Sequence, residues 1–196
     1  MPEKKSHRHG GGFKKTVLLF LSIAMLFFFF WKVNSLLNEY FGKENRYDKT
    51  IRNIAKRYCI DSRLLKAVIW RESRFNSGAR GNKGEIGLMQ LMRKASVQDW
   101  ANYYNVELPC EGVLYNPELN IEIGAWYLSR ALRKWQDFGH AEELALCEYN
   151  AGRKMADKWK PDNKSEDMTD RIKIDSTRDY VEKIMEKYSE YCNKKR

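Results

Sequence analysis

Histidine is scarce in this sequence, and the few copies are poorly placed for binding a metal ion. Among the 196 residues there are three histidines, and two of them lie in the stretch SHRHGGG within the first twelve positions. The four cysteines do not follow the short spacings from which zinc sites are built; they are Cys59, Cys110, Cys147 and Cys192. The sequence therefore argues against a metal centre.

Three further absences narrow the class of protein. No run of alternating polar and apolar residues is long enough to build a sheet, and no internal repeat is visible. The formal net charge of +10 favours an anionic neighbour, which could be a nucleic acid, a phospholipid surface or an acidic polymer. No compact Lys/Arg block with interleaved aromatic residues follows position 15, so nucleic acid is the weakest of these candidates.

A single long uncharged run lies near the N-terminus. Residues 16–31, TVLLFLSIAMLFFFFW, carry no charge, and basic residues dominate positions 1–15 before them. Apolar residues continue to position 37, so the run reaches the length of at least ~18 residues that is typical of a membrane span. A cleaved signal peptide, an uncleaved anchor and a buried core helix are the three alternatives.

The uncleaved anchor is the interpretation that we favour for residues 16–37. Cleavage after the small residues Ser22 and Ala24 would leave MLFFFFW as the new N-terminus, which does not suit a soluble product. The positive-inside bias then predicts a cytoplasmic leader at 1–15 and an exported remainder. The expected location is the inner membrane, crossed once, with the bulk of the chain in the periplasm.

All four cysteines follow the predicted anchor and would enter an oxidising compartment. An even number permits two disulfides in any of three pairings, and the sequence leaves the pairing open. We expect at least one intramolecular disulfide. Cys147 is the expected exception, because its place in a predicted helix is typical of a small buried hydrophobic residue.

After a charged connector at 38–47, residues 48–192 predict a mainly α-helical domain. Asn116 and Pro117 are typical of a helix cap and a first helical position, and Gly152 is typical of a helix end. The predicted helices cover 48–58, a segment that begins at Asp61 or Ser62, 88 to about 104, 117–135, 141–149 and 177–192.

Glu72 is the most informative single residue. Leu65, Val68 and Glu72 are spaced at i, i+3 and i+7, so the carboxyl continues the apolar face of its helix. A carboxyl on an apolar face loses hydration, and its pKa rises. A carboxylic acid that stays protonated near neutral pH can serve as the general acid of glycosidic cleavage. A salt bridge to Arg71 or Arg74 is the alternative.

A glycine-rich bend follows Glu72 and leads into the segment GLMQLM. Glycines at 78, 81, 84 and 87 let the backbone approach a ligand closely. Gln90 offers a hydrogen-bond donor and an acceptor, while Met89 and Met92 offer adaptable apolar walls or ordinary core packing. This combination is typical of a groove for a carbohydrate or a peptide.

Four blocks in a fixed order resemble a known family. They read ESRFN…GEIGLMQLM, YNPELNIEIGAWYLSRAL, ALCEYNAG and IDSTRDYVEKIM, and they cover roughly residues 48–190. Together they resemble the catalytic domain of the soluble lytic transglycosylases, which has a lysozyme-like fold. The resemblance implies a lyase that cleaves the MurNAc-β-1,4-GlcNAc bond of peptidoglycan and leaves 1,6-anhydro-MurNAc ends. The family's reaction needs no metal and no organic cofactor. The expected partners are the glycan strands of peptidoglycan, the membrane through the N-terminal anchor, and an envelope or secretion assembly; nucleic acid is not expected.

The resemblance also assigns roles to individual residues. It makes Glu72 the catalytic acid/base and Tyr149 the residue that orients the catalytic centre. The residues expected to bind substrate are Ser73, Met89, Gln90, Met92, Asn150 and Tyr180.

Departures from the family pattern leave two other functions open. Gly81 replaces an expected serine, and Glu85 and Glu148 occupy positions where small residues are common. A hydrolytic muramidase could use either glutamate to activate water. The second alternative is a non-catalytic peptidoglycan-binding module of an envelope assembly.

Overall fold

The structure is a computed structural model that describes residues 11–194; the side chains of 11–17, 19–22, 38–41 and 169 are outside the description. The first ten positions of the predicted leader 1–15 therefore lie outside the described residues. The chain divides into two compact units, Met1–Lys43 and Glu44–Arg196.

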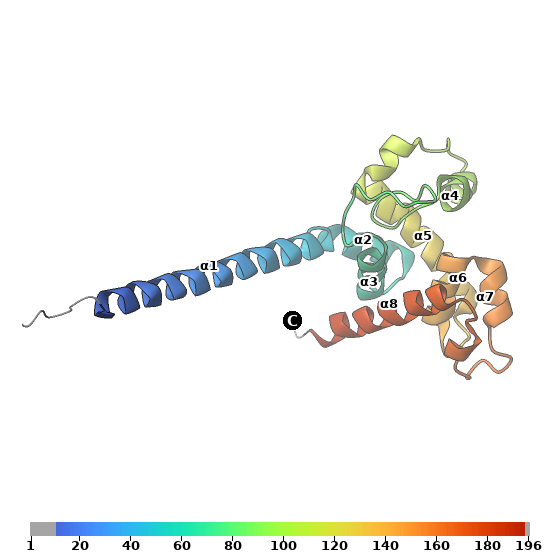
Figure 1. Cartoon of the computed structure of the whole chain (residues 1–196). Helices are drawn as coiled ribbons and strands as arrows, with labels where there is room; N and C mark the ends of the chain where they lie inside the picture. The colour runs from blue at the N-terminus through green and yellow to red at the C-terminus, as the bar shows by residue number, and fades with distance from the viewer. Residues whose placement is uncertain (1–10, 195–196) are drawn as a thin grey trace, which may run out of the picture. The chain divides into compact units, whose positions relative to one another are not determined.

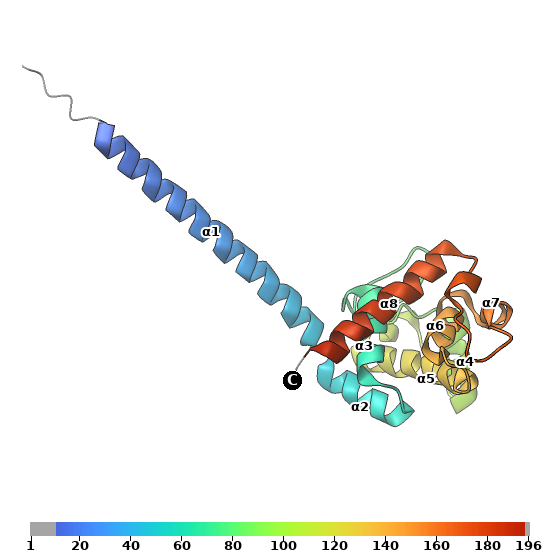
Figure 2. The ribbon, with the colours of Figure 1, turned by 90° about the horizontal axis from the view of Figure 1, so that it is seen from below.

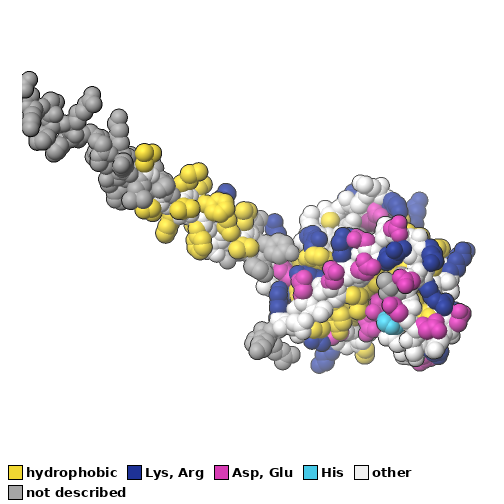
Figure 3. All heavy atoms as spheres, turned by 60° about the horizontal axis from the view of Figure 1, so that its bottom comes forward, with side chains coloured by type: hydrophobic (Ala, Val, Ile, Leu, Met, Phe, Trp, Pro, Cys, Tyr) yellow, Lys and Arg dark blue, Asp and Glu magenta, His cyan; other side chains and the backbone are white. Residues whose placement is uncertain are grey.

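The described part of the first unit is one long helix. The helix α1 spans Gly11–Asn45 and so includes the whole of the predicted anchor 16–37 (Figure 1). Its phenylalanines at 27–30 are between 63% and 75% exposed, and Figure 3 shows hydrophobic side chains gathered along this helix. In the part of the chain that the structure describes, no helix meets both the length and the hydropathy needed to cross a membrane.

The second unit is mainly helical, as predicted. The β-structure among its described residues is limited to two isolated antiparallel bridges, which join Arg80 to Ile86 and Ile86 to Leu91. Its helices are α2 (Asp48–Tyr58), α3 (Ser62–Ser73), α4 (Gln98–Tyr104), α5 (Pro117–Trp135), α6 (Ala141–Ala151), α7 (Arg153–Trp159) and α8 (Asp175–Asn193). Short π and 3-10 turns lie at Arg93–Val97 (η1), Glu111–Tyr115 (η2) and Thr169–Arg171 (η3).

The helix ends follow the capping residues in the sequence. The Asp61 carboxylate accepts a hydrogen bond from the Arg63 backbone N–H at 2.8 Å, and α3 begins there. Asn116 caps α5 in the same way, with Pro117 in the first helical position. Gly152, at φ +84°, ends α6 with its N–H on the Glu148 carbonyl at 2.9 Å.

The segment from 88 to about 104, which was expected to be mostly helical, is helical only from Arg93 onward. Gly87 and Gln90 have φ of +77° and +48°, in the left-handed region that stops a helix. Residues 88–92 therefore form a bend, and regular helix begins only after it, with η1 and α4. The short helix α7 was also missed, because its seven residues directly follow the glycine that ends α6.

α5 lies in the middle of the second unit and organises its core. Its apolar residues Ile121, Ile123 and Leu128 are fully buried, and the helix packs on α2, α4 and α6 (Figure 2). On another side of the unit, α3 packs along α8. This second pairing brings the C-terminal turn of α3, which carries Glu72, against the N-terminal half of α8.

The predicted disulfide is wrong in this structure. All four cysteines are free thiols, and three of them are exposed: Cys59, Cys110 and Cys192. They lie at the end of α2, in the loop before η2 and in the last turn of α8, so no two share an element. Cys147 is buried, as expected, and burial raises the pKa of its thiol to about 12.

Candidate active site

Glu72 lies in the last turn of α3, seven residues after the buried Leu65 and four after the buried Val68, and is itself half-buried. This position agrees with the predicted apolar face. Burial raises the pKa of this carboxyl from 4.5 to about 7, and the nearby charge of Glu85 adds to the rise. A hydrogen bond from Tyr180 and the charge of Arg71 act in the opposite direction but are outweighed. Glu72 can therefore hold and release a proton near neutral pH.

Tyr180 holds the carboxyl in place. Its hydroxyl donates to Glu72 Oε1 at 2.6 Å, across the contact between α8 and α3. Tyr180 is buried, and burial raises the pKa of its phenol well above the ordinary value, so it remains a donor. Arg71 lies over the Tyr180 ring at 5.4 Å and pairs with Asp179 at 3.2 Å. Arg71 thus fixes α8 rather than neutralising Glu72.

Tyr149, on α6, lies on the same side of the unit but makes a different contact. Its hydroxyl donates to the backbone carbonyl of Met89 at 2.9 Å. Burial and the charge of Glu72 raise the pKa of Tyr149 well above the ordinary value. Of the two tyrosines, Tyr180 rather than Tyr149 therefore touches the Glu72 carboxyl, and Tyr149 fixes the bend that carries Met89.

The bend at 78–92 is held from behind by Asn120 of α5. The amide of Asn120 donates to the carbonyls of Ile86 (2.9 Å) and Leu114 (2.8 Å), and its oxygen accepts from the Met89 N–H at 2.8 Å. Asn120 is 1% exposed. Gly87 makes the close approach possible, since a Cβ there would collide with the Asn120 amide.

Asn120 was missed in reading the sequence, although a signal exists. It lies four residues before Gly124 on α5, on the apolar side of that helix. A polar residue on an apolar face needs hydrogen-bond partners inside the protein. Asn120 therefore belongs to the framework of the site.

The remaining predicted site residues divide into buried and accessible ones. Met89 is fully buried, with its side chain in the space that Gly124 leaves, whereas Met92 is 42% exposed. The Gln90 amide donates to the Gly87 carbonyl at 2.9 Å. Ser73 donates to the Leu88 carbonyl at 2.9 Å, which ties the end of α3 to the bend. Asn150 accepts from the Thr177 hydroxyl at 2.8 Å and so links α6 to α8. Their roles toward a substrate remain predictions.

A family model, described as Transglycosylase SLT domain, matches residues 49–172. The chain belongs to this family. The matched range contains Glu72, Gln90 and Tyr149 but ends before α8, so the partner of Glu72, Tyr180, comes from outside it.

The chain is also similar to lytic murein transglycosylases and to solved structures of lytic transglycosylases. The chain is 28% identical over 146 residues to membrane-bound lytic murein transglycosylase E of Buchnera aphidicola, covering 67% of this chain and 65% of the relative. It is 31% identical over 88 residues to membrane-bound lytic murein transglycosylase C of Edwardsiella ictaluri, covering 44% of this chain and 24% of that protein. The chain thus spans about a quarter to two thirds of the length of these two relatives.

Among solved structures, the lytic transglycosylase Slt of Pseudomonas aeruginosa matches with a TM-score of 0.63 and 27% identity, over 76% of this chain and 24% of that one. The 70-kDa soluble lytic transglycosylase of Escherichia coli matches with a TM-score of 0.61 and 22% identity, over 72% and 24% of the two chains. The second likeness supports the fold alone.

Glu85 and Glu148, the two glutamates that depart from the family pattern, have different surroundings. The Glu148 carboxylate is buried and accepts from Trp135 (3.0 Å), Lys134 (3.2 Å) and Arg153 (3.3 Å). Three hydrogen-bond donors from the protein therefore already use the Glu148 carboxylate as their acceptor. Glu85, by contrast, is only partly buried, and its carboxylate accepts from the Lys83 N–H at 2.8 Å.

Glu85 also fills the space beside Gly81. A Cβ at position 81 would collide with the Glu85 carboxylate and come within 2.9 Å of Gln90 Oε1. The two departures from the family pattern, Gly81 and Glu85, are therefore linked. As for metals, no three His, Cys, Asp or Glu side chains among the described residues are grouped as an ion would require.

Proposed function

We propose that this chain is a peptidoglycan lytic transglycosylase, which cleaves the MurNAc-β-1,4-GlcNAc bond and leaves 1,6-anhydro-MurNAc ends. The observation that carries the proposal is Glu72, a carboxyl whose pKa burial raises to about 7 and which accepts a hydrogen bond from Tyr180. The similarity to relatives named lytic murein transglycosylases supports the same activity.

In the proposed reaction one carboxyl acts twice. Protonated Glu72 donates its proton to the glycosidic oxygen while the bond from that oxygen to the muramic C1 breaks. The substrate's own N-acetyl group stabilises the anomeric centre, a known exception to the scheme with two carboxylates. The C6 hydroxyl of the same sugar then attacks C1, and the Glu72 carboxylate takes the hydroxyl proton. The acid is restored, and no water is consumed.

Product mass tests the proposal. Purified sacculi are digested with the protein, and the soluble muropeptides are analysed by mass spectrometry. The anhydro product is lighter by one water than the product of hydrolysis. Products with a reducing MurNAc end would instead support a muramidase, with Glu85 as the carboxylate that activates water, because Glu148 is fully hydrogen-bonded. Binding to sacculi without any release would support the non-catalytic alternative.

We also propose that residues 16–37 anchor the chain in the inner membrane, with the leader 1–15 in the cytoplasm and the domain 48–192 in the periplasm. The uncharged run at 16–31, the basic residues before it and the exposed phenylalanines at 27–30 support this arrangement. Protease added to spheroplasts should degrade the domain, and the full-length chain should fractionate with the inner membrane. A released protein that lacks the first ~25 residues would contradict the anchor.

A further inference from the structure

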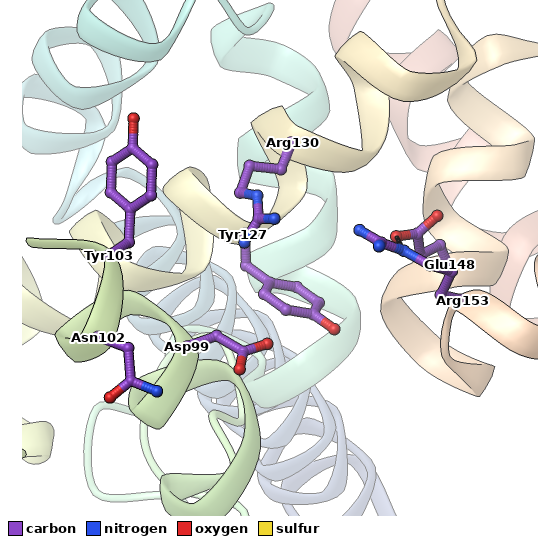
Figure 4. Close-up of a pocket in the computed structure, with 7 residues that line it drawn as sticks. All are labelled: Asp99, Asn102, Tyr103, Tyr127, Arg130, Glu148 and Arg153. Carbon is purple, nitrogen blue, oxygen red and sulfur yellow. Dashed lines mark hydrogen bonds and ion pairs between the residues drawn. The ribbon is translucent and has the colours of Figure 1, made fainter.

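Two charged regions lie outside the catalytic centre, and they differ in the balance of their charges. The first is a pocket of about 460 Å³ between α4, α5 and the α6–α7 pair, with the Tyr127 phenol in its wall (Figure 4). Two carboxylates, Asp99 and Glu148, and two guanidinium groups, Arg130 and Arg153, line this pocket, so its charges balance in number. The second region is the exposed side of α2, where they do not.

The exposed side of α2 and the turn before it carry basic residues. Lys49, Arg52 and Lys56 are spaced at i, i+3 and i+7, which places them on one side of the helix, and Arg46 lies in the preceding turn. All four are exposed, whereas the opposite side of α2, with apolar residues at 51, 54 and 55, is buried. We call these four residues the basic face of α2.

The carboxylates nearest to the basic face are already paired with other cations. Asp48 pairs with Lys66 at 2.6 Å and with Arg52 only at 3.9 Å. Glu122 of α5 accepts a hydrogen bond from Arg57, which lies outside the basic face. The other three members of the basic face form no ion pair with a described carboxylate; they are Arg46, Lys49 and Lys56. The basic face therefore has a surplus of positive charge.

The catalytic centre does not use this surplus. Its residues come from α3, from the bend at 78–92, and from α6 and α8. The buried side of α2 packs on α3 and α5, and Figure 2 shows α2 along an outer edge of the second unit. The basic face therefore points away from these helices, and a glycan bound at Glu72 does not account for its charge.

The basic face follows the predicted anchor closely in the chain. Arg46 comes nine residues after position 37, and the residues between them belong to α1, which ends at Asn45. Nine residues advance about 14 Å as a helix. When residues 16–37 span the bilayer core, the headgroup layer takes up roughly 5–7 Å of this distance. Arg46 then lies within about one Debye length of the lipid surface, which is ~8 Å at physiological salt.

We propose that the basic face of α2 binds the anionic phospholipid headgroups of the membrane in which residues 16–37 are anchored. The inference rests on the anchor proposed above. Lipid phosphates attract Lys and Arg side chains, and each basic residue near an anionic lipid surface strengthens binding by about 5-fold. Three cations without an ion pair should therefore strengthen the association of the domain with the surface by roughly 100-fold. The contact holds the domain at the lipid surface with α2 toward the headgroups.

Quenching of a fluorescent dye by spin-labelled headgroups tests this contact. The dye is attached to Cys59, the exposed residue that ends α2, in a full chain that also carries Cys110→Ser and Cys192→Ser. The chain is reconstituted into phosphatidylcholine vesicles with increasing amounts of phosphatidylglycerol. Quenching should rise with the anionic lipid and should fall again in about 0.5 M salt, because salt screens exposed charges.

The decisive variant removes the three cations that have no ion pair, through Arg46→Gln, Lys49→Gln and Lys56→Gln. The association constant derived from the quenching should fall roughly 100-fold, so that quenching stays near its level in neutral vesicles. Because the three side chains are exposed, the fold should be retained, and circular dichroism checks this.

A matched control removes the same charge elsewhere in the second unit. It combines Lys154→Gln, Lys158→Gln and Lys160→Gln, three exposed lysines on α7 and directly after it. The control should keep the quenching of the wild type. Unchanged quenching in the basic-face variant, or an equal loss in both variants, would overturn the proposal. So would a basic-face variant that loses binding to purified sacculi while its quenching is unchanged, because the face would then bind the wall.

Flotation with neutral vesicles separates failure of the anchor from failure of the basic face. A chain that floats with phosphatidylcholine vesicles in about 0.5 M salt is held by its anchor, since charge plays no part there. If it does not float, the anchor proposal fails, and flotation with phosphatidylglycerol vesicles at low salt tests the basic face alone. Binding by the wild type and the control that is lost in the basic-face variant would support the lipid contact. Equal binding by all three proteins, or none, would overturn it.

Discussion

The proposed catalytic centre around Glu72 and the charged pocket around Tyr127 adjoin through the contact between Tyr149 and Tyr127, but they are built in opposite ways. Around Glu72, burial disfavours the charged form, the neutral phenol of Tyr180 donates to the carboxyl, and the pKa of this acid rises to about 7. Around Tyr127, the side chains are charged and partly exposed, and several form ion pairs. The first arrangement suits proton transfer, and the second suits recognition of a charged ligand.

The two regions also differ in how closely their residues follow the family pattern. Glu72, Gln90 and Tyr149 are residues that the family resemblance assigns to the site, whereas Glu148 departs from the family pattern. Changes in the catalytic centre should therefore abolish the reaction, while changes around the pocket should alter preference or stability by smaller amounts.

The largest expected effect is that of Glu72→Gln. Glutamine keeps the shape of the side chain but cannot donate and recover a proton. General acid–base catalysis alone contributes ~10²–10⁴-fold, and a residue used in both steps should reach or exceed the upper end. The release of anhydromuropeptides from sacculi measures the loss, and circular dichroism checks the fold. A folded variant that still cleaves at nearly the wild-type rate would show that the acid has been assigned wrongly.

The same variant tests the burial of Glu72 independently of catalysis. Because the folded state holds the proton up to about pH 7 and the unfolded state releases it near pH 4.5, this group stabilises the fold fully below pH 4.5. The contribution falls as pH rises and is lost above pH 7, a change of roughly 3 kcal/mol. Urea unfolding at pH 4.5 and pH 8 should show this change in the wild type relative to Glu72→Gln. Equal pH dependence in the two proteins would mean that the carboxyl is hydrated.

Asn120→Ala should have the next largest effect, because it breaks the framework of the catalytic centre. The change removes the Asn120 partner of the Met89 N–H and of the Leu114 carbonyl, whereas the Ile86 carbonyl still accepts from the Leu91 N–H. Each unsatisfied buried group costs about 1–3 kcal/mol, so we expect a loss of at least about 2 kcal/mol in the free energy of unfolding. Thermal unfolding should show a fall of roughly 4–8 °C. Asn193→Ala, at an exposed position near the end of α8, is the control and should change stability little.

Part of this site could be predicted from the sequence, because the spacing of apolar residues around Glu72 is a local pattern. The spacing of Leu65, Val68 and Glu72 places the acid on the buried face without reference to the rest of the chain. Asn116 and Gly152 mark helix ends by the same kind of short-range chemistry. Local patterns thus predicted the acid and most of the helix boundaries.

What the sequence did not reveal depends on contacts between distant segments. The hydrogen bond from Tyr180 to Glu72 joins residues 108 positions apart and exists only because α8 packs on α3. The left-handed backbone at Gln90 is not a conformation that glutamine prefers, and the surrounding bend imposes it. The donors around Glu148 likewise come from the end of α5 and the start of α7, which the sequence alone does not bring together.

The two tyrosines provide a smaller, directional test inside the catalytic centre. Tyr180→Phe removes a hydrogen bond that favours the ionised form of Glu72. The pKa of Glu72 should therefore rise, and the fall of kcat/KM above pH 7 should move to higher pH. Tyr149→Phe removes the bond to the Met89 carbonyl instead, so the rate should fall modestly while the pH profile keeps its position. Equal shifts of the pH profile in both variants would contradict the separate roles of the two phenols.

The smallest expected effect comes from two carboxylates that share one lysine beside the pocket. Lys134 Nζ pairs with Glu148 Oε2 at 3.2 Å and with Asp157 Oδ1 at 2.9 Å. The distances are similar, but the Glu148 side chain is 7% exposed and that of Asp157 is 44% exposed. Water screens the exposed pair, so Asp157→Asn should change the free energy of unfolding by less than about 0.5 kcal/mol.

Glu148→Gln should cost more, about 1–3 kcal/mol, because two cations lose their shared buried anion. Urea unfolding of both variants and of the wild type at pH 7 gives the comparison, and repetition in 0.5 M salt checks its origin. Salt should reduce any effect of Asp157→Asn and leave most of the effect of Glu148→Gln, since buried charges are screened less. If both variants lose the same small amount, the Glu148 cluster is as hydrated as the surface around it.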